Sequence, residues 1–416
     1  MSQTFDVLRD PGYRRLWISG FCISAARWMD IVALGWLALQ LTGSPFMVGL
    51  AAFARSAPLM VVGPFGGLIA DRLPLARVLV ATQAGGLVVA ATLAALFATG
   101  YGGYWPLIAL ELVFGALWAV DFPARRTALY ALLGAARVAQ AVSLETVSMQ
   151  IAKMLGPLAM GLCLARAGAA AAFAMIAVVY AGALVASLGL RHQLGGPGAA
   201  PTSSVMEGLR RGLEVAWTNG TVRAVLLATI AMNTLFFPYQ HMLPVFARDV
   251  LDVGPAVLGA MFAADGCGAL AGALVIAARG GHLDHARLFA AAIVAGPILL
   301  AAFSGSQWLT VCVVLLVIMG AAESSFAAMQ STVVLLNAPA HARGGAMGIL
   351  SACIGTQPVG TLFIGFLAAS VGVSLAFFVN SLIALAVVVP LAMRLLRPGG
   401  LRAPPTPPSG PFPAKP

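Results

Sequence analysis

The fold of this chain is decided by the stretch Gly66-Gly67-Leu68-Ile69-Ala70-Asp71-Arg72-Leu73-Pro74-Leu75-Ala76-Arg77. A long apolar run ends here at an acid–base pair, and the chain turns apolar again with one more Arg in between. Two membrane-length segments joined by so short a charged link are expected to form a tight antiparallel hairpin. The charges then lie at the water boundary on one side of a bilayer.

The composition of the whole chain supports a membrane protein. Of its 416 residues 60% are hydrophobic and only 9% are charged, and the mean hydropathy is +0.94. Soluble domains carry roughly a quarter charged residues. The net charge of +10 would suggest nucleic acid in a polar protein. Here the basic residues fall in short links between apolar runs, which indicates orientation in a bilayer and no nucleic-acid partner.

Enzyme and metal signatures are missing from the sequence. The five Cys all fall inside apolar runs without CxxC spacing, which favours core residues over disulfides or zinc. There is no Walker loop, and the five His are scattered. The first ten residues are polar and charged, so we expect no cleavable signal peptide. We therefore predict no catalytic residue, no metal and no cofactor.

Apolar runs of about 20 residues predict twelve membrane spans. They lie near 16–41, 46–70, 78–99, 105–128, 139–165, 169–190, 223–246, 255–278, 286–303, 307–332, 344–369 and 373–395. The sequence thus predicts an all-α membrane protein with two pseudo-symmetric six-helix bundles. The predicted parts are an N-terminal bundle (1–190), a cytoplasmic linker (191–222), a C-terminal bundle (223–396) and a disordered Pro-rich tail (397–416).

The linker contains a predicted amphipathic helix. Ser204 and Glu207 fit a capping box, and helical spacing joins Val205, Leu209, Leu213 and Trp217. We expect this helix to lie on the membrane face between the bundles.

Lys and Arg are distributed unevenly over the links. With the N-terminus inside, nineteen lie in cytoplasmic segments, two (Arg166 and Arg248) in outer links and three within spans. The positive-inside rule then places both termini in the cytoplasm.

Two glycine patterns recur in corresponding spans of the two bundles. Gly156-Pro157-x3-Gly161 in span 5 matches Gly360-x4-Gly365 in span 11 at an offset of 204. Ser44-Pro45-x3-Gly49 before span 2 matches Gly254-Pro255-x3-Gly259 before span 8 at an offset of 210. Because glycine lets membrane helices pack closely, we expect Gly156, Pro157, Gly161, Gly360 and Gly365 to serve helix packing.

Ionisable residues lie well inside six of the predicted spans. They are Arg27 and Asp30 (span 1), Arg55 (span 2), Glu111 (span 4), Glu145 and Lys153 (span 5), Asp265 (span 8) and Glu323 (span 10). A charge in hydrocarbon costs about 2.5–3.5 kcal/mol on insertion scales, so these side chains need an aqueous cavity or a partner. The pattern predicts spans 1, 2, 4, 5, 8 and 10 around a central substrate and proton cavity, and spans 3, 6, 9 and 12 outside.

Lys153 is singular because the chain contains 22 Arg and only one other Lys, in the tail. A Lys at this depth suggests a group able to release its proton. The alternative is a structural ion pair across the bundles, most plausibly with Asp265. Lys153 also occupies the repeat position of Gln357, which indicates a cavity-facing polar position in each bundle.

Two further pairings stay open from sequence. Arg55 and Asp265 are repeat equivalents of opposite charge, which suggests a cavity basic on one side and acidic on the other. Arg27 and Asp30 are three residues apart and can pair with each other. Glu323 and Glu111 lack charged neighbours in sequence, so they are candidates for a proton or cation site. Glu111 is alternatively a solvated residue at the outer mouth.

Several of these segments resemble the major facilitator superfamily. Its signature between helices 2 and 3 is matched by Gly67, Asp71, Arg72 and Arg77, with Pro74 in place of the second glycine and Ala76 in place of the first basic residue. Residues 5–17, 32–45 and Phe122-Pro123-Ala124-Arg125 resemble the transmembrane secretion effector branch, which includes the enterobactin exporter. The resemblance covers roughly residues 5–395.

This resemblance implies alternating access, with two six-helix bundles rocking around a midplane site. It also implies a cytoplasmic gate, for which we expect Gly67, Asp71, Arg72, Arg77, Asp121, Arg125 and Arg126. The implied setting is the bacterial plasma (inner) membrane, and the implied form is a monomer.

Three functional hypotheses follow. The first is a proton-coupled exporter of small amphipathic molecules such as drugs, siderophores or secondary metabolites. The second is an importer or uniporter of a small organic solute in the same fold. The third is a non-transporting membrane sensor or scaffold, against which the many charges within the spans argue.

Overall fold

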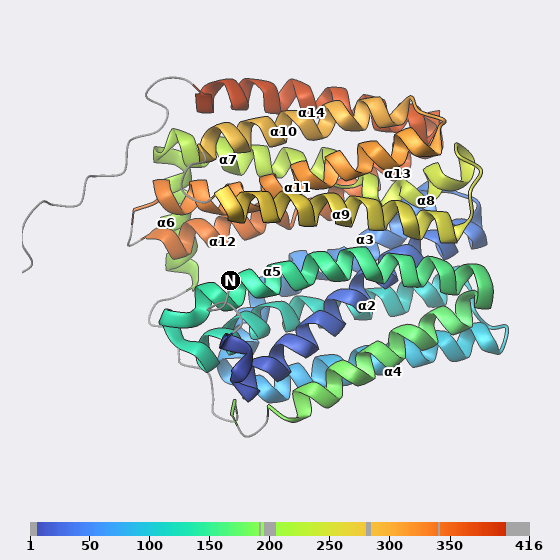
Figure 1. The fold of residues 1–416 in the computed structure, drawn as a ribbon, viewed down its shortest axis with the longest axis horizontal. Helices are drawn as coiled ribbons and strands as arrows, with labels where there is room; N and C mark the ends of the chain where they lie inside the picture. The colour runs from blue at the N-terminus through green and yellow to red at the C-terminus, as the bar shows by residue number, and fades with distance from the viewer. Residues whose placement is uncertain (1–5, 191–192, 195–204, 280–283, 340–341, 397–416) are drawn as a thin grey trace, which may run out of the picture.

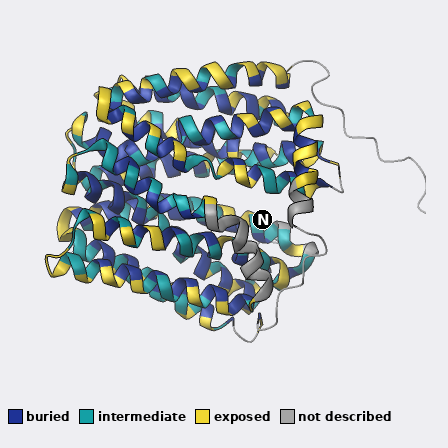
Figure 2. Ribbon diagram, turned by 180° about the vertical axis from the view of Figure 1, so that it is seen from behind, coloured by how far each residue is buried: buried dark blue, intermediate teal, exposed yellow. Residues whose placement is uncertain are grey.

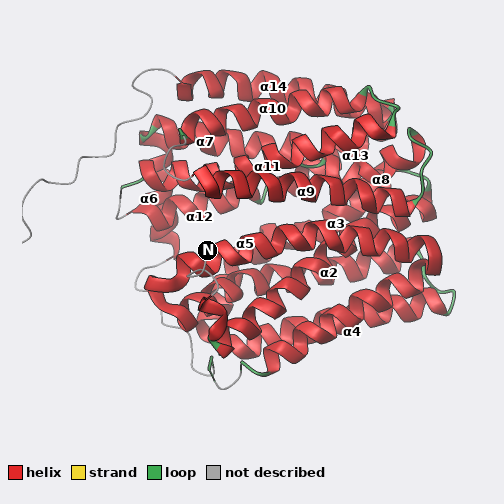
Figure 3. Cartoon of the chain, in the orientation of Figure 1, coloured by secondary structure: helices red, strands yellow, loops and turns green. Residues whose placement is uncertain are grey.

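The computed structural model describes residues 6–190, 193–194, 205–279, 284–339 and 342–396, with the side chains of 61–72, 135, 136, 139 and 205–209 outside the description. Every regular element in these ranges is a helix, which confirms the all-α prediction (Figure 3). In chain order the helices are η1 (Asp6–Arg9), α2 (Pro11–Thr42), α3 (Pro45–Arg72), α4 (Leu75–Ala98), α5 (Tyr104–Leu188), α6 (Val205–Thr218), α7 (Gly220–Ala231), η2 (Met232–Phe236), α8 (Tyr239–Asp249), α9 (Pro255–Arg279), α10 (His285–Ser304), α11 (Leu309–Asn337), α12 (Arg343–Ile354), α13 (Gln357–Val371) and α14 (Val373–Leu396).

The charged link of residues 66–77 is shorter than a typical loop. Helix α3 ends at Arg72 and α4 begins at Leu75, so two residues separate them. The predicted tight turn is present, but over the part of the chain that is described the two arms make few contacts with each other. Each instead packs mainly against α5, because α5 fills the space between them (Figure 1). The turn of the predicted hairpin is thus confirmed, whereas close pairing along its two arms stays a prediction.

Helix α5 is a chain of shorter segments rather than one rod. Its backbone leaves helical geometry at Gly134 (φ 65°) and at Gly168 (φ 76°). A positive φ of this kind is strained for residues with a Cβ, which explains glycine at both breaks. The chain reverses at these points and returns through the bundle (Figure 1).

Ten helical segments in the described ranges are long and apolar enough to cross a membrane. One of them, Gln140–Leu188, has 49 residues and contains the break at Gly168, and a further apolar helix, Pro45–Met60, is shorter. At 1.5 Å per residue 49 residues are far longer than a bilayer core of about 30 Å. Both observations are compatible with twelve spans, which stays a prediction.

The helices form two groups that run between the same two ends of the molecule (Figure 1). We call α2–α5 the N-terminal group and α7–α14 the C-terminal group; the exact domain boundaries near 190 and 222 stay predictions. Helix α4 lies along one outer edge, and α10 and α14 lie along the other, as expected for spans without charges. Large apolar side chains are exposed, including Val88, Val185 and Phe366. Exposed residues recur along the outer helices (Figure 2). Such a surface fits contact with lipid.

Helix α6 confirms that the linker contains a helix. It lies at one end of the molecule and packs against α12, where Gly212 allows the backbone at Gly345 to come close. Trp217 is exposed, as a helix at a membrane surface requires. Ser204 of the predicted capping box lies outside the described residues.

Candidate functional site

Six of the predicted cavity residues form two separate buried clusters. The Arg55 cluster consists of Asp30 of α2, Arg55 of α3 and Glu111 of α5. The Lys153 cluster consists of Lys153 of α5, Asp265 of α9 and Glu323 of α11. Each cluster contains one cation and two carboxylates, and all six side chains are at least nine-tenths buried.

In the Arg55 cluster all three charged groups come from the N-terminal group of helices. Arg55 Nε lies 2.5 Å from Asp30 Oδ2 and 3.2 Å from Glu111 Oε2. The Arg55 guanidinium also lies over the ring of Phe114, with 5.5 Å between its Cζ and the ring centroid. The Nε–H of Arg55 thus donates to Asp30, whereas Glu111 faces the same guanidinium as an ion pair without a hydrogen bond in the described part of the chain.

Two sequence hypotheses fail at this cluster. Asp30 pairs with Arg55 rather than with Arg27, because Arg55 reaches in from the neighbouring helix between Asp30 and Glu111. The Arg27 guanidinium instead lies 4.3 Å from the ring centroid of Trp118, a cation–π arrangement. Glu111 is fully buried, so it is not a solvated mouth residue.

The Lys153 cluster joins the two groups of helices. Lys153 Nζ lies 2.6 Å from Asp265 Oδ2 and 2.8 Å from Glu323 Oε2. The predicted ion pair with Asp265 is therefore present, and Glu323 extends it. The same Nζ lies 5.1 Å from the ring centroid of Trp28. A cation from the N-terminal group is held by two acids from the C-terminal group.

Two further side chains fix Glu323, and sequence reasoning missed their role. The Tyr239 hydroxyl donates to Glu323 Oε1 at 2.8 Å, and Gln240 Nε2 lies 3.1 Å from both carboxylate oxygens. The available signal was Gln240, which stands 210 residues after Asp30, the same offset that relates Asp265 to Arg55.

A helix break delivers these two residues to the site. Residues Met232–Phe236 form a π-helical turn, followed by Pro238 and then α8. Proline has no N–H, so the carbonyl of Thr234 loses its α-helical donor. That carbonyl lies where a Cβ on Gly360 would collide with it, which is why glycine is required there. π-Turns of this kind are frequent at functional sites.

The last predicted cavity residue, Gln357, lies apart from the charges. It is the first residue of α13, after the helix is interrupted at Gly355 and Thr356, and it is half-buried. Within the described part of the chain no hydrogen bond or ion pair joins it to either cluster.

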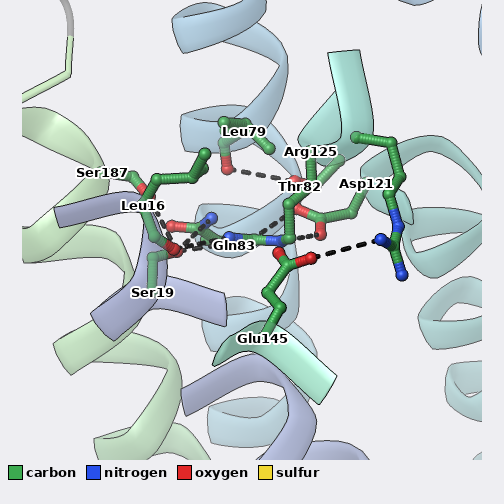
Figure 4. A network of polar contacts seen from close by, with 10 residues as sticks. Leu16, Ser19, Leu79, Thr82, Gln83, Asp121, Arg125, Glu145 and Ser187 are labelled. Carbon is green, nitrogen blue, oxygen red and sulfur yellow. Dashed lines mark hydrogen bonds and ion pairs between the residues drawn. The ribbon is translucent and has the colours of Figure 1, made fainter. Parts of the chain in front are cut away.

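A third polar network lies toward the end of the N-terminal group where α2 begins (Figure 4). Arg125 pairs with Asp121 at 3.1 Å and donates to the carbonyl of Leu16. Thr82 donates to Asp121 at 2.9 Å, so the carboxylate is held from two helices. Ser19 connects Gln83, Arg125 and Ser187 to the same network. Figure 4 shows these side chains converging from α2, α4 and α5.

The remaining predicted gate residues have mixed positions. Arg126 is partly exposed and pairs with Glu145 at 3.4 Å, beside a small cavity lined by Trp118, Arg125 and Glu145. Arg77 is exposed. The side chains of Gly67, Asp71 and Arg72 lie outside the described residues, so the predicted latch stays a prediction.

The two sequence repeats pack against each other across the groups. A Cβ on Gly161 of α5 would lie 3.0 Å from Cα of Gly259 in α9. A Cβ on Gly49 of α3 would lie 3.0 Å from Cα of Gly365 in α13. Gly161 and Gly365, which belong to the repeat with offset 204, thus contact Gly259 and Gly49, which belong to the repeat with offset 210. Gly156 has a different partner, since it packs on the backbone of Ala25 in α2.

These crossings lie toward the end of the molecule away from the start of α2. We call this the Arg-poor end, because its links contain only Arg166 and Arg248. There the side chain of Arg248 donates to the carbonyl of Leu39 at 3.2 Å, and Pro244 lies against Gly35. The groups are therefore joined from the Lys153 cluster outward to the Arg-poor end.

Membrane-length apolar helices in two groups, with the Lys153 cluster held between them, are the arrangement expected of an integral-membrane transporter of the major facilitator fold. The sequence profile of the family described as "Transmembrane secretion effector" matches residues 2–407, and the chain belongs to this family. The family consists of transporters rather than enzymes, as the sequence predicted.

Relatives and solved structures agree with this assignment. The chain is 27% identical to the multidrug efflux pump Tap of Mycolicibacterium fortuitum over 86% of this chain and 89% of that protein. It is 23% identical to the staphyloferrin A transporter of Staphylococcus aureus over 62% and 65% of the two chains. A crystal structure of a POT family transporter in complex with a thioalcohol-conjugated peptide superposes with a TM-score of 0.74 at 13% identity, covering 93% and 97%.

Proposed function

We propose that this protein exports small amphipathic molecules, such as drugs, siderophores or secondary metabolites, in exchange for protons. It acts as a monomer in the bacterial plasma membrane, with both termini in the cytoplasm. The observation that carries the proposal is the Lys153 cluster. Its cation and its acids belong to different groups of helices, so any movement of one group against the other changes the cluster.

The charge of the Lys153 cluster supports proton coupling. Two carboxylates face one ammonium group, which leaves one formal negative charge in excess when all three are ionised. Uncompensated charge is costly at membrane depth, so taking up one proton or one cation is favourable. One charge moving across 100 mV supplies about 2.3 kcal/mol, enough for a roughly fiftyfold gradient.

The positions of the contacts between groups support alternating access. Close glycine crossings join the groups at the Arg-poor end, which the positive-inside rule places outside the cell. This arrangement corresponds to a state closed to the outside. The names of the relatives, a multidrug efflux pump and a siderophore transporter, support the substrate classes.

Transport in energised cells tests the function directly. Cells expressing the protein are loaded with a fluorescent amphipathic drug, and its accumulation is measured with and without an uncoupler. We expect lower accumulation than in empty-vector cells, lost on uncoupling and lost in Asp265→Asn. Accumulation that rises with expression would favour the second candidate, an importer or uniporter.

Lys153→Arg tests which group of the cluster carries the proton. Arginine keeps the positive charge but does not release its proton in proteins. If Lys153 is the carrier, the pH dependence of efflux is lost in this variant. If efflux keeps its pH dependence, the proton is carried by Asp265 or Glu323 and Lys153 serves as their counter-ion.

The predicted latch has its own test. We expect Asp71→Asn to abolish efflux while the protein stays inserted and folded, because the substitution removes the negative charge on which the predicted cytoplasmic latch depends. Membrane-fraction yield and size-exclusion profile serve as folding controls. Normal efflux in Asp71→Asn would remove residues 66–77 from the transport cycle.

A further inference from the structure

Resting on the transporter function proposed above, we propose that Asp265, Glu323 and Trp28 form a receptor for the ammonium group of the substrate. Lys153 occupies this receptor as a tethered ligand, which the substrate must displace. The substrate class is then amphipathic molecules that carry a primary ammonium group.

The surroundings of Lys153 Nζ have the composition expected of an ammonium site. Two carboxylate oxygens lie 2.6 Å and 2.8 Å away, and an indole ring lies at 5.1 Å on centroid distance. Carboxylates accept the N–H donors, and an aromatic face attracts the positive charge. A substrate ammonium group would meet the same three partners.

The acceptors are held in place independently of Lys153. Tyr239 donates to Glu323 Oε1, and Gln240 bridges both oxygens of that carboxylate. The receptor is therefore preorganised, which lowers the cost of binding an external cation.

Asp265 has acceptor capacity that Lys153 does not fill. Its side chain is 1% exposed, and its Oδ1 atom has no hydrogen-bond partner in the described part of the chain. Burying an unsatisfied carboxylate oxygen is costly. A substrate with several N–H donors would satisfy this oxygen as well as Oδ2, which gives it an advantage over the lysine.

The position of Lys153 makes it a displaceable occupant. Its four-carbon stem is flexible and has a single charged end. It enters from α5 of the N-terminal group, whereas both acids belong to the C-terminal group. In contrast, Arg55 and its two acids all lie within the N-terminal group, so no ion pair of that cluster crosses between the groups.

Lys153→Ala provides the test, because it removes three carbons and the ammonium group. We measure binding of n-propylammonium to the purified variant in detergent by calorimetry, with propan-1-ol as the neutral probe of equal size. We expect propylammonium to bind Lys153→Ala about tenfold or more tightly than wild type, since a tethered competitor acts at millimolar effective concentration. Propan-1-ol is expected to show no such gain.

Lys153→Met is the matched control, since it lacks the charge but fills the space. We expect a smaller gain in propylammonium affinity in this variant than in Lys153→Ala, and no gain in Lys153→Ala combined with Asp265→Asn. Equal affinity of propylammonium for wild type and Lys153→Ala, or equal gains for amine and alcohol, would overturn the proposal. If Lys153→Ala is not recovered folded, Lys153→Ser is measured with the same two probes and the same criteria.

Binding and transport are read separately in this design. Calorimetry needs no membrane or gradient, so it tests the receptor alone. Efflux of 2-phenylethylammonium from energised vesicles, compared with 2-phenylethanol, tests transport of the class. Receptor binding without any efflux would refute the proposed function and leave the receptor standing. Efflux of neutral drugs without propylammonium binding would support the proposed function and refute the receptor.

Discussion

The Arg55 and Lys153 clusters stand at related positions but are built differently. Arg55 and Asp265 are separated by the same offset of 210 that relates the glycines of α3 and α9. Each cluster sets one cation between two acids. In the N-terminal group this position is occupied by the cation, Arg55. In the C-terminal group it is occupied by an acid, Asp265, so the cation of that cluster, Lys153, comes from α5 of the other group.

This difference separates a structural cluster from one that responds to movement. When the groups move as rigid bodies, the Arg55 cluster keeps all its partners, because they travel together. The Lys153 cluster gains or loses its cation in the same movement. Breaking a buried ion pair leaves an uncompensated charge and costs several kcal/mol. The relative free energy of the two arrangements of the groups therefore depends on which cation is bound to Asp265 and Glu323.

The largest expected effect comes from Arg55→Leu. It leaves Asp30 and Glu111 buried without their cation in every arrangement of the groups, which should cost about 3–5 kcal/mol. We expect a strongly lowered unfolding temperature and a reduced yield in detergent. Arg55→Leu combined with Asp30→Asn and Glu111→Gln should recover much of the loss. A stable single variant would contradict the structural role.

Lys153→Met should affect conformation more than stability. Its two acids can be rehydrated when the groups part, so the unfolding temperature should fall less than in Arg55→Leu. Spin labels at positions 166 and 252 of a cysteine-free background report separation at the Arg-poor end. We expect a shift to longer distances. The proposed difference between the clusters would be contradicted if Lys153→Met had the same distance distribution as wild type and were destabilised as much as Arg55→Leu.

Gly161→Ala tests whether the glycine crossings stabilise the observed arrangement. The new Cβ would meet the Gly259 backbone at 3.0 Å, and overpacking of this kind costs about 1–3 kcal/mol. The same labels should report separation at the Arg-poor end. Gly182→Ala is the control, because its nearest neighbour is Cys22 Sγ at 3.9 Å. Similar behaviour of both variants would show that the crossing is not specific.

Tyr239→Phe should cost about 1 kcal/mol, since it removes one hydrogen bond to Glu323 while Gln240 still donates to that carboxylate. We expect a small loss of stability and a measurable change in the pH dependence of efflux, because Glu323 loses one of the two side chains that donate hydrogen bonds to its carboxylate. Phe237→Leu, two residues before Tyr239 in sequence, should leave the pH profile unchanged.

Arg126→Ala is expected to have the smallest effect, below about 1 kcal/mol. Its side chain is 41% exposed and its distance to Glu145 is 3.4 Å, so water screens the pair. The unfolding temperature should change by no more than a few degrees. A loss as large as that of Arg55→Leu would show that the network at this end contributes more than its exposure indicates.

The sequence by itself determined the class of this protein and the depth of its charges. Apolar runs of membrane length force helices, because backbone groups in lipid need partners within the same segment. The repeat offsets also identified the glycines that lie where helices of the two groups cross, because closely packed helices require small residues at the contact. Lys153 and Asp265 were paired correctly because both lie at similar depth in spans that face inward.

Only the tertiary structure decided which helices meet. Depth along a helix follows from sequence, but the direction in which a side chain points toward other helices does not. Asp30 therefore has Arg55 as its partner instead of Arg27, and Glu111 is buried. Tyr239 and Gln240 reach Glu323 only because a π-turn and Pro238 redirect the chain. Lys153 and Glu323 are 170 residues apart, and only packing of the two groups brings them to 2.8 Å.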